Sequence, residues 1–200
     1  LILGAGDIGR NIVNRLKAFG VSTAGIRRQK SSDGDTVCVS ASNTDSSPIR
    51  SREFPGFDQL DTSDHLDDYL PEADLVIGCL PCTPDTTGLM SRVRLALMKP
   101  DALFVNVGRG NLVRSADLID ALQEGALGGV ILDVFETEPL PEDSPLWDME
   151  NVMITPHISG PSFGGNQQVQ DTIWEICMEN MEHFLNQEPL QHVVDLEAGY

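Results

Sequence analysis

The stretch Leu1-Ile2-Leu3-Gly4-Ala5-Gly6-Asp7-Ile8-Gly9 decides the fold, because a short apolar run leads directly into the pattern Gly-x-Gly-x-x-Gly. Apolar residues at helical spacing follow from Ile8 to Phe19, and Gly20 ends this predicted helix. A second apolar run over 21–26 predicts the next strand and completes a β-α-β unit with parallel strands. This arrangement predicts a dinucleotide-binding site at the glycines.

Each glycine of the motif has a physical task. Gly4 permits a tight turn after the strand, and Gly6 lets the backbone approach a pyrophosphate. Gly9 lets the helix pack closely against the strand. The backbone N–H groups of Asp7 and Ile8 would then face the diphosphate at the helix N-terminus, where the helix dipole favours negative charge.

Strands and helices alternate along the rest of the chain. Apolar runs predict buried strands over 75–80, 103–107, 129–134 and 152–155, and helical spacing predicts helices over 65–69, 86–97, 116–123 and 168–185. Ser115 is expected to cap the helix over 116–123, and Gly125 to end it. Residues 29–54 are polar and aperiodic, which indicates a mobile surface insertion, unless a short strand forms over 37–39. The alternation predicts an α/β fold with a doubly wound parallel sheet of the Rossmann type, covered on both faces.

The composition excludes several classes of protein. The 200 residues carry a formal net charge of -18, which argues against nucleic-acid binding, a task that needs a basic face. A hydrophobic content of 40% allows a packed core, and no apolar run approaches the roughly 20 residues of a membrane span. With this charge, an anionic cofactor must find positive potential locally, in arginines and helix N-termini.

The four cysteines do not form a disulfide framework. Cys79 and Cys82 make a Cys-x-x-Cys pair, for which zinc binding or redox chemistry is the alternative. Because no second pair accompanies them, we interpret both as small apolar residues at the end of a buried strand, and we predict no metal site. Free thiols indicate a reducing compartment, so we expect a cytoplasmic location. The chain begins inside a strand at Leu1, which indicates a fragment and leaves an organellar location open.

The end of the second predicted strand bears on the choice of cofactor. An NAD site usually places Asp or Glu there to hold the ribose 2′-hydroxyl, whereas this chain has Arg27 and Arg28. An arginine pairs with the 2′-phosphate that an acidic residue would repel, and one charge-assisted hydrogen bond contributes roughly 1.5–3 kcal/mol. We therefore predict NADP(H) as the preferred cofactor and NAD(H) as the weaker one. The alternative is a solvated basic turn.

Three further candidates each follow a predicted strand, namely Arg109, Glu138 and His157. In an open parallel sheet the ligand crevice lies outside the carboxyl ends of the strands, so these side chains should converge near the nicotinamide. Taken singly, Arg109 could form an ion pair in a turn, Glu138 could be a surface acid, and His157 could be a loop histidine. The conjunction of the three favours a catalytic site.

Five stretches carry a wider pattern: Gly4-Ala5-Gly6-Asp7-Ile8-Gly9-Arg10, Leu80-Pro81-Cys82-Thr83-Pro84-Asp85-Thr86, Asn106-Val107-Gly108-Arg109-Gly110, Leu132-Asp133-Val134-Phe135 and Thr155-Pro156-His157. Together they resemble the D-isomer-specific 2-hydroxyacid dehydrogenases over nearly the whole chain, apart from the insertion after Gln29. The stretches Glu138-Pro139-Leu140-Pro141 and Ser144-Pro145-Leu146-Trp147 are most similar to the glyoxylate/hydroxypyruvate reductase branch.

The resemblance implies a role for each candidate. Arg109 would hold the substrate carboxylate and polarise its 2-oxo group, and His157 would be the general acid in reduction. Glu138 would hydrogen-bond the imidazole, orient it and favour its protonated form. Asp133 would lie near the nicotinamide carboxamide. The remaining cofactor contacts would be Leu80, Pro81, Thr86, Val107, Gly108 and Gly160, together with Arg109 and His157 themselves.

The resemblance also implies a division into domains. Residues 1–163 would form the NAD(P)-binding Rossmann domain, and residues 164–200 the linking helix and tail of a substrate domain whose larger part, absent here, precedes the glycine motif. The full-length protein would be a homodimer acting on a small 2-oxo acid such as glyoxylate or hydroxypyruvate. Phosphoglycerate, formate or phosphite dehydrogenase activity stays open. The alternatives are a dinucleotide-sensing protein similar to the family's corepressors, and a truncated, inactive cofactor-binding domain.

Overall fold

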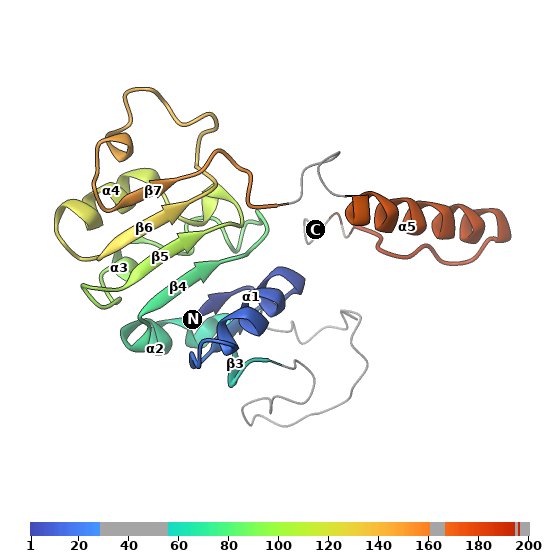
Figure 1. The fold of residues 1–200 in the computed structure, drawn as a ribbon, viewed down its shortest axis with the longest axis horizontal. Helices are drawn as coiled ribbons and strands as arrows, with labels where there is room; N and C mark the ends of the chain where they lie inside the picture. The colour runs from blue at the N-terminus through green and yellow to red at the C-terminus, as the bar shows by residue number, and fades with distance from the viewer. Residues whose placement is uncertain (29–55, 161–166, 195, 197–200) are drawn as a thin grey trace.

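The computed structural model describes residues 1–28, 56–160, 167–194 and 196. Within these residues, seven parallel strands form one sheet in the order β3-β2-β1-β4-β5-β6-β7 (Figure 1). The strands are β1 (Ile2–Leu3), β2 (Ala24–Arg27), β3 (Gln59–Thr62), β4 (Leu75–Gly78), β5 (Leu103–Asn106), β6 (Gly129–Leu132) and β7 (Val152–Ile154). The insertion expected over 29–54, with its alternative strand at 37–39, lies outside the described residues.

Helices and turns connect the strands. The helices are α1 (Asp7–Lys17), α2 (Leu66–Tyr69), α3 (Arg92–Leu95), α4 (Ser115–Gln123) and α5 (Gln167–Asn186). Single 3₁₀ turns lie at η1 (Ser63–His65), η2 (Leu70–Glu72), η3 (Gly110–Leu112) and η4 (Pro145–Trp147). The predicted stop of the helix before Gly125 is confirmed, because α4 ends at Gln123 and Gly125 has a φ of 70°.

The strand order reverses at β1, which pairs with β2 on one side and with β4 on the other. The chain leaves β1 through the glycine turn, runs along α1 and returns in the same direction as β2. Later strands continue outward from β4 to β7 (Figure 1). The predicted doubly wound Rossmann fold is thereby confirmed, and ligands of such folds bind at the reversal, outside the carboxyl ends of the strands.

Apolar side chains bury the two faces of the sheet in separate layers. Val76 and Ile77 are neighbours in β4 and belong to different layers, because successive strand residues point to opposite faces. The smaller layer includes Val13 of α1, which is fully buried. The larger layer takes in Phe104 of β5 and apolar residues of α2, α3 and α4, such as Leu118.

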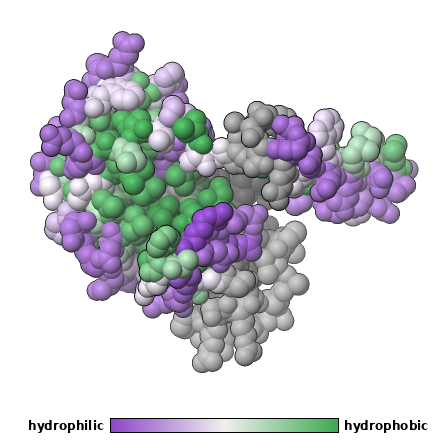
Figure 2. All heavy atoms as spheres, in the orientation of Figure 1, coloured by the Kyte–Doolittle hydropathy of each residue, from purple (hydrophilic) through white to green (hydrophobic). Residues whose placement is uncertain are grey.

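The α1 face of the sheet is only partly covered within the described residues. Val105, Ile131 and Met153 lie side by side in register across β5, β6 and β7. Met153 is 59% exposed, and the other two are partly exposed. Figure 2 shows the corresponding apolar surface beside α1.

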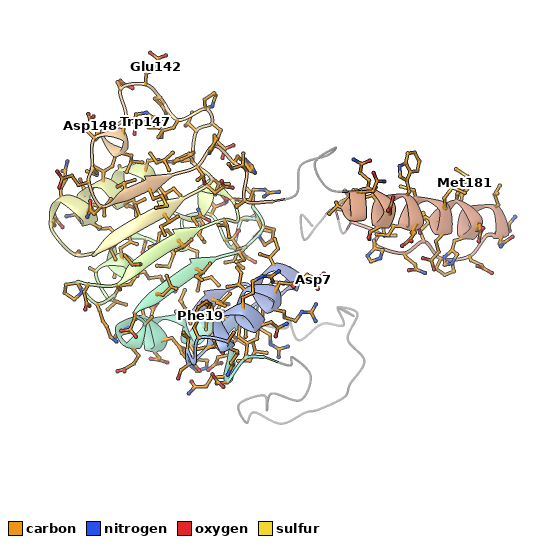
Figure 3. The ribbon with its side chains drawn as sticks, viewed as in Figure 1. Asp7, Phe19, Glu142, Trp147, Asp148 and Met181 are labelled. Carbon is orange, nitrogen blue, oxygen red and sulfur yellow. The ribbon has the colours of Figure 1, made fainter. Side chains whose placement is uncertain are left out.

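The long helix α5 stands apart from the sheet (Figure 1). Its large apolar side chains are exposed, with Trp174 at 67% and Phe184 at 73%, and Met181 projects from the helix in Figure 3. Among the described residues, no helix combines the length and apolar character that a membrane crossing requires. The predicted helix over 168–185 is confirmed, and its apolar stripe lacks a cover within the described part of the chain.

The structure contains one strand that was not predicted, and the helix predicted over 86–97 is shorter than expected. The strand β3 was missed because its sequence, Gln59-Leu60-Asp61-Thr62, is polar, as suits a strand at the edge. The helix shrinks to α3, because the hydroxyls of Thr86 and Thr87 bond back within the preceding turn and Gly88 has a φ of 65°. Val93, in the remaining turn of α3, is 72% exposed.

The expected capping role of Ser115 is also wrong. Ser115 is the first residue of α4, and Arg114 precedes it as the N-cap without a side-chain hydrogen bond. The carboxylate of Glu136 instead accepts the backbone N–H of Ser115 at 2.9 Å, from 21 residues away along the chain. A negative charge at a helix N-terminus is stabilising, so a tertiary contact replaces the local cap.

Candidate active site

A ladder of backbone hydrogen bonds continues past the carboxyl ends of the strands and aligns the loops that carry the candidate residues. In each rung, the residue just after one strand donates its N–H to the last residues of a neighbouring strand. The rungs are Gly4 to Ile26, Cys79 to Leu3, Val107 to Gly78, Asp133 to Asn106 and Thr155 to Leu132, with N···O distances of 2.8 to 3.0 Å. These five loops therefore start along one edge of the sheet.

The glycine turn at the end of β1 tolerates no side chain at two positions. Gly4 has a φ of 108°, and a Cβ there would lie 2.9 Å from the carbonyl oxygen of Cys79. A Cβ on Gly9 would lie 2.0 Å from the carbonyl oxygen of Gly4. These close approaches bring the first turn of α1 directly over the end of β1, as the motif predicts.

The N-terminus of α1 fits an anionic group. The N-cap residue is Gly6, so no side chain caps the first N–H groups of the helix. There is open space where a Cβ of Gly6 would be. Asp7 and Ile8 follow and are exposed, with Asp7 labelled in Figure 3. The side chain of Asp7 forms an ion pair with Arg10, which offsets its charge near the helix N-terminus. Uncapped N–H groups beside open space are what a diphosphate requires.

Arg27 and Arg28 lie at the end of β2, next to the glycine turn. Arg27 is the last residue of the strand and is partly buried, whereas Arg28 is exposed. The preceding residue, Ile26, accepts the N–H of Gly4 at 2.9 Å. The two guanidinium groups therefore supply positive charge close to the glycine motif in a strongly acidic chain.

The loop after β4 follows the reversal point. Leu80 and Pro81 are partly exposed, and the hydroxyl of Thr86 donates to the carbonyl of Pro81 at 2.7 Å. Cys79 is partly buried, and burial raises the pKa of its thiol to about 11. Both cysteines were interpreted as small apolar residues at the end of a buried strand. Cys79 directly follows β4, whereas Cys82 is exposed in the loop beyond it. Among the described residues, no cluster of metal-ligating side chains occurs.

The loop after β5 carries Arg109. Asn106 is buried, and its side-chain amide donates to the carbonyl of Arg109 at 2.9 Å and accepts from the N–H of Gly108 at 3.2 Å. A Cβ on Gly108 would lie 2.7 Å from the carbonyl oxygen of Leu80, so this loop passes directly against the loop after β4. The side chain of Arg109 remains exposed, and its guanidinium donates to the carbonyl of Gly108 at 2.8 Å.

Backbone contact then joins the Arg109 loop to the loop after β6. A Cβ on Gly110 would lie 1.8 Å from the carbonyl oxygen of Phe135, so only glycine allows this approach. The N–H of Phe135 donates to one carboxylate oxygen of Glu138 at 3.0 Å, and the other carboxylate oxygen meets Nδ1 of His157 at 2.8 Å. Arg109, Glu138 and His157 are thus linked through a short series of contacts.

The surroundings of Glu138 favour its ionised form. Its hydrogen bond with His157, followed by that from the N–H of Phe135, holds the pKa of Glu138 below its usual value. Because the contact uses Nδ1 of His157, the other ring nitrogen is left for exchange with a substrate. A carboxylate, an imidazole and a guanidinium in this order suit the reduction of an anionic carbonyl compound.

Asp133 and Gly160 are the last two of the residues expected near the cofactor. Asp133 is only 2% exposed and accepts four hydrogen bonds from Thr155, Ile158 and Ser159. Burial alone would raise its pKa, but these hydrogen bonds outweigh it and lower the pKa of Asp133 to about 2. Gly160 is exposed and has open space at its Cβ position.

Comparison with known proteins bears on this edge of the sheet. A family model described as the D-isomer specific 2-hydroxyacid dehydrogenase, NAD binding domain, matches residues 40–159. The chain belongs to the D-isomer-specific 2-hydroxyacid dehydrogenase family. Glyoxylate/hydroxypyruvate reductase A of Serratia proteamaculans is 35% identical over 158 residues, which are 79% of this chain and 44% of that protein.

Solved structures agree with this membership. A D-isomer specific 2-hydroxyacid dehydrogenase from Xanthobacter autotrophicus, solved with NADPH and MES, has a TM-score of 0.80 at 32% identity, covering 100% of this chain and 71% of that chain. An NADPH-dependent glyoxylate/hydroxypyruvate reductase from Sinorhizobium meliloti, solved with NADP and sulfate, has a TM-score of 0.75 at 31% identity, with coverages of 100% and 56%. The expected resemblance to this branch of the family is confirmed. The chain spans about half the length of the curated relatives it matches.

Sequence reasoning missed three residues that shape the site. Asn106 and Gly110 belong to the quoted motif around Arg109, but their contacts run to the backbone of other loops. Glu136 ties the loop before Glu138 to the N-terminus of α4. A buried amide directly after an apolar strand was the available signal for Asn106, whereas the sequence carries no signal for the contact of Glu136.

Two matched glycine substitutions distinguish a glycine that would face the cofactor from a glycine that is needed for packing. Gly6→Ala places its methyl group in open space at a negative φ, so stability should stay within about 0.5 kcal/mol while NADPH binding weakens at least about tenfold. Gly9→Ala forces a methyl group against the carbonyl of Gly4 and should destabilise the fold. Urea unfolding and NADPH fluorescence titration measure the two effects. Equal loss of stability in both variants would contradict this assignment.

The lowered pKa of Asp133 predicts a defined dependence of stability on pH. A group whose pKa is depressed in the folded state stabilises the fold above its unfolded pKa and loses this contribution as pH falls through the folded value. A fall from 3.8 to about 2 corresponds to about 2 kcal/mol. Urea unfolding of wild type and Asp133→Asn should therefore differ less at pH 2 than at pH 5, by about this amount. A difference that stays constant with pH would refute the prediction.

Proposed function

We propose that the protein carrying this chain is an oxidoreductase that reduces a small 2-oxo acid to the 2-hydroxy acid with NADPH. The observation that carries the proposal is the 2.8 Å contact between Nδ1 of His157 and the carboxylate of Glu138, at the same sheet edge as the glycine turn and Arg109. Family membership supports this class of reaction.

The candidate cofactor residues fit an anionic dinucleotide. Uncapped N–H groups at Asp7 and Ile8 would hold the diphosphate, and Arg27 with Arg28 would hold the 2′-phosphate of NADP(H). The other proposed contacts line the exit loops along the same edge: Leu80, Pro81, Thr86, Val107, Gly108, Asp133 and Gly160. The NADP-containing structural relatives support the preference for the phosphorylated cofactor.

Each catalytic candidate has a separate task. NADPH, when bound, supplies the hydride for the carbonyl carbon. Arg109 would bind the substrate carboxylate, for which an exposed guanidinium is well suited. His157 would donate a proton from Nε2 to the carbonyl oxygen, because its Nδ1 is held by Glu138. The hydrogen bond with His157 lowers the pKa of Glu138, so the ionised carboxylate is favoured, and it would orient the imidazole and balance its positive charge.

The substrate class follows from the small anion that Arg109 would bind. Glyoxylate and hydroxypyruvate are the proposed substrates, supported by relatives that carry these names. We further propose that residues 1–163 form the coenzyme domain and residues 164–200 link it to a substrate domain. The exposed apolar side chains of α5 and the greater length of the relatives support this division. A homodimer in the cytoplasm completes the proposal.

The cofactor preference can be measured by direct titration. NADPH should bind at least about tenfold more tightly than NADH, because the 2′-phosphate gains a charge-assisted hydrogen bond from Arg27 or Arg28. The Arg27→Ala/Arg28→Ala variant should lose this ratio, whereas Arg92→Ala, which removes a distant surface charge, should keep it. Equal or tighter binding of NADH by the wild type would refute the preference.

The role of His157 can be separated from cofactor binding. His157→Ala should lose most turnover of glyoxylate or hydroxypyruvate, by about 10²–10⁴-fold, because the proton donor is removed. NADPH affinity should change little, and His65→Ala, an exposed histidine in η1, serves as the matched control. Unchanged turnover in a folded His157→Ala protein would exclude the proposed role.

A further inference from the structure

The turn after β7 is held by one buried carboxylate. Asp133 follows β6 and reaches across to the turn from Thr155 to Ser159, 22 to 26 residues further along the chain. One oxygen accepts the hydroxyl of Thr155 at 2.5 Å and the N–H of Ile158 at 2.9 Å. The other oxygen accepts the N–H of Ser159 at 2.9 Å and the hydroxyl of Ser159.

These four hydrogen bonds use the whole acceptor capacity of the group. An ionised carboxylate offers about four acceptor sites, two on each oxygen. Asp133 receives two donors on each oxygen and is only 2% exposed. The observed contacts therefore direct the carboxylate toward the turn.

The residue enclosed by these contacts is His157. Its φ of 56° lies in the left-handed region, which is unfavourable for a residue with a Cβ. Its own N–H donates to the carbonyl of Thr155 at 3.1 Å, which closes the tight turn. The donors to Asp133 flank His157 on both sides, at Thr155 before it and at Ile158 and Ser159 after it. The carboxylate thus stabilises a backbone conformation that the sequence alone would not prefer.

We propose that Asp133 is a positioning residue, whose carboxylate holds His157 in the left-handed conformation that brings its Nδ1 to Glu138. The effect on turnover rests on the proposed reductase function, whereas the effect on the conformation of His157 does not. The role needs the ionised group, because an ionised carboxylate presents acceptors only. The isosteric Asp133→Asn would direct an amide N–H group toward two of the four donors.

The first test uses the apo chain and is independent of catalysis. Amide hydrogen exchange at Ile158 and Ser159, with the ring ¹⁵N signals of His157, is compared in wild type, Asp133→Asn and Asp120→Asn. Asp133→Asn should speed exchange of the two amides at least about tenfold and move the His157 Nδ1 signal away from its hydrogen-bonded position. Asp120→Asn, which removes an exposed carboxylate paired with Arg92, should match the wild type. Unchanged amide exchange and ring signals in Asp133→Asn would overturn the proposal.

The second test separates positioning from cofactor contact by kinetics. Asp133→Asn should lower kcat at least about tenfold. The Thr155→Val/Ser159→Ala variant keeps the carboxylate and removes two of its donors. It should lower kcat in the same direction while the Kd for NADPH stays within about twofold, which also covers the case of an unfolded Asp133→Asn. Full kcat in a folded Thr155→Val/Ser159→Ala protein would overturn positioning. Wild-type protein without 2-oxo-acid turnover would refute the reductase function, and the exchange experiment would still decide the role of Asp133.

Discussion

Parallel backbone pairing that continues beyond the strand ends is the constraint on which the rest of this structure depends. Five N–H groups, each on a residue just after a strand, bond to a neighbouring strand, from Gly4 in the first loop to Thr155 in the last. Each rung sets the position and direction in which a loop leaves the sheet. Chemistry carried by loops far apart in sequence is therefore confined to one edge, as doubly wound sheets require.

Close contacts between loops then convert this shared edge into a site. Gly108 and Gly110 let the Arg109 loop touch both neighbouring loops through the backbone, and the contact of Gly110 with Phe135 leads on to the hydrogen bonds of Glu138. The buried carboxylate of Asp133 adds a longer-range restraint on the conformation of His157. The site thus depends on glycines and one carboxylate as much as on the groups that would meet a substrate. The net charge of -18 makes local sources of positive potential, at α1 and at the end of β2, essential for an anionic cofactor.

Features that depend on a local sequence pattern could be predicted from the sequence. Features that depend on a contact between residues far apart in the chain could not. The glycine motif predicted the turn, α1 and the parallel pairing of β1 with β2, because Gly4 and Gly9 act within a few residues of one another. Arg109, Glu138 and His157 were predicted as a group because each follows a strand. The helix over 86–97 and the cap at Ser115 were wrong, since hydroxyl bonds inside the turn and the remote Glu136 override local propensity. The four bonds of Asp133 could not be foreseen, because its partners lie 22 or more residues away.

The proposed arrangement of cofactor and substrate can be observed in a structure of the chain bound to NADP⁺ and oxalate, an analogue of glyoxylate that cannot be reduced in the same way. We expect the diphosphate at the N–H groups of Asp7 and Ile8, the 2′-phosphate at Arg27 and Arg28, and the nicotinamide at the edge that carries His157. Oxalate should lie between the nicotinamide and the imidazole, with one of its two carboxylates toward Arg109. A dinucleotide bound elsewhere, or a nicotinamide directed away from His157, would contradict this arrangement.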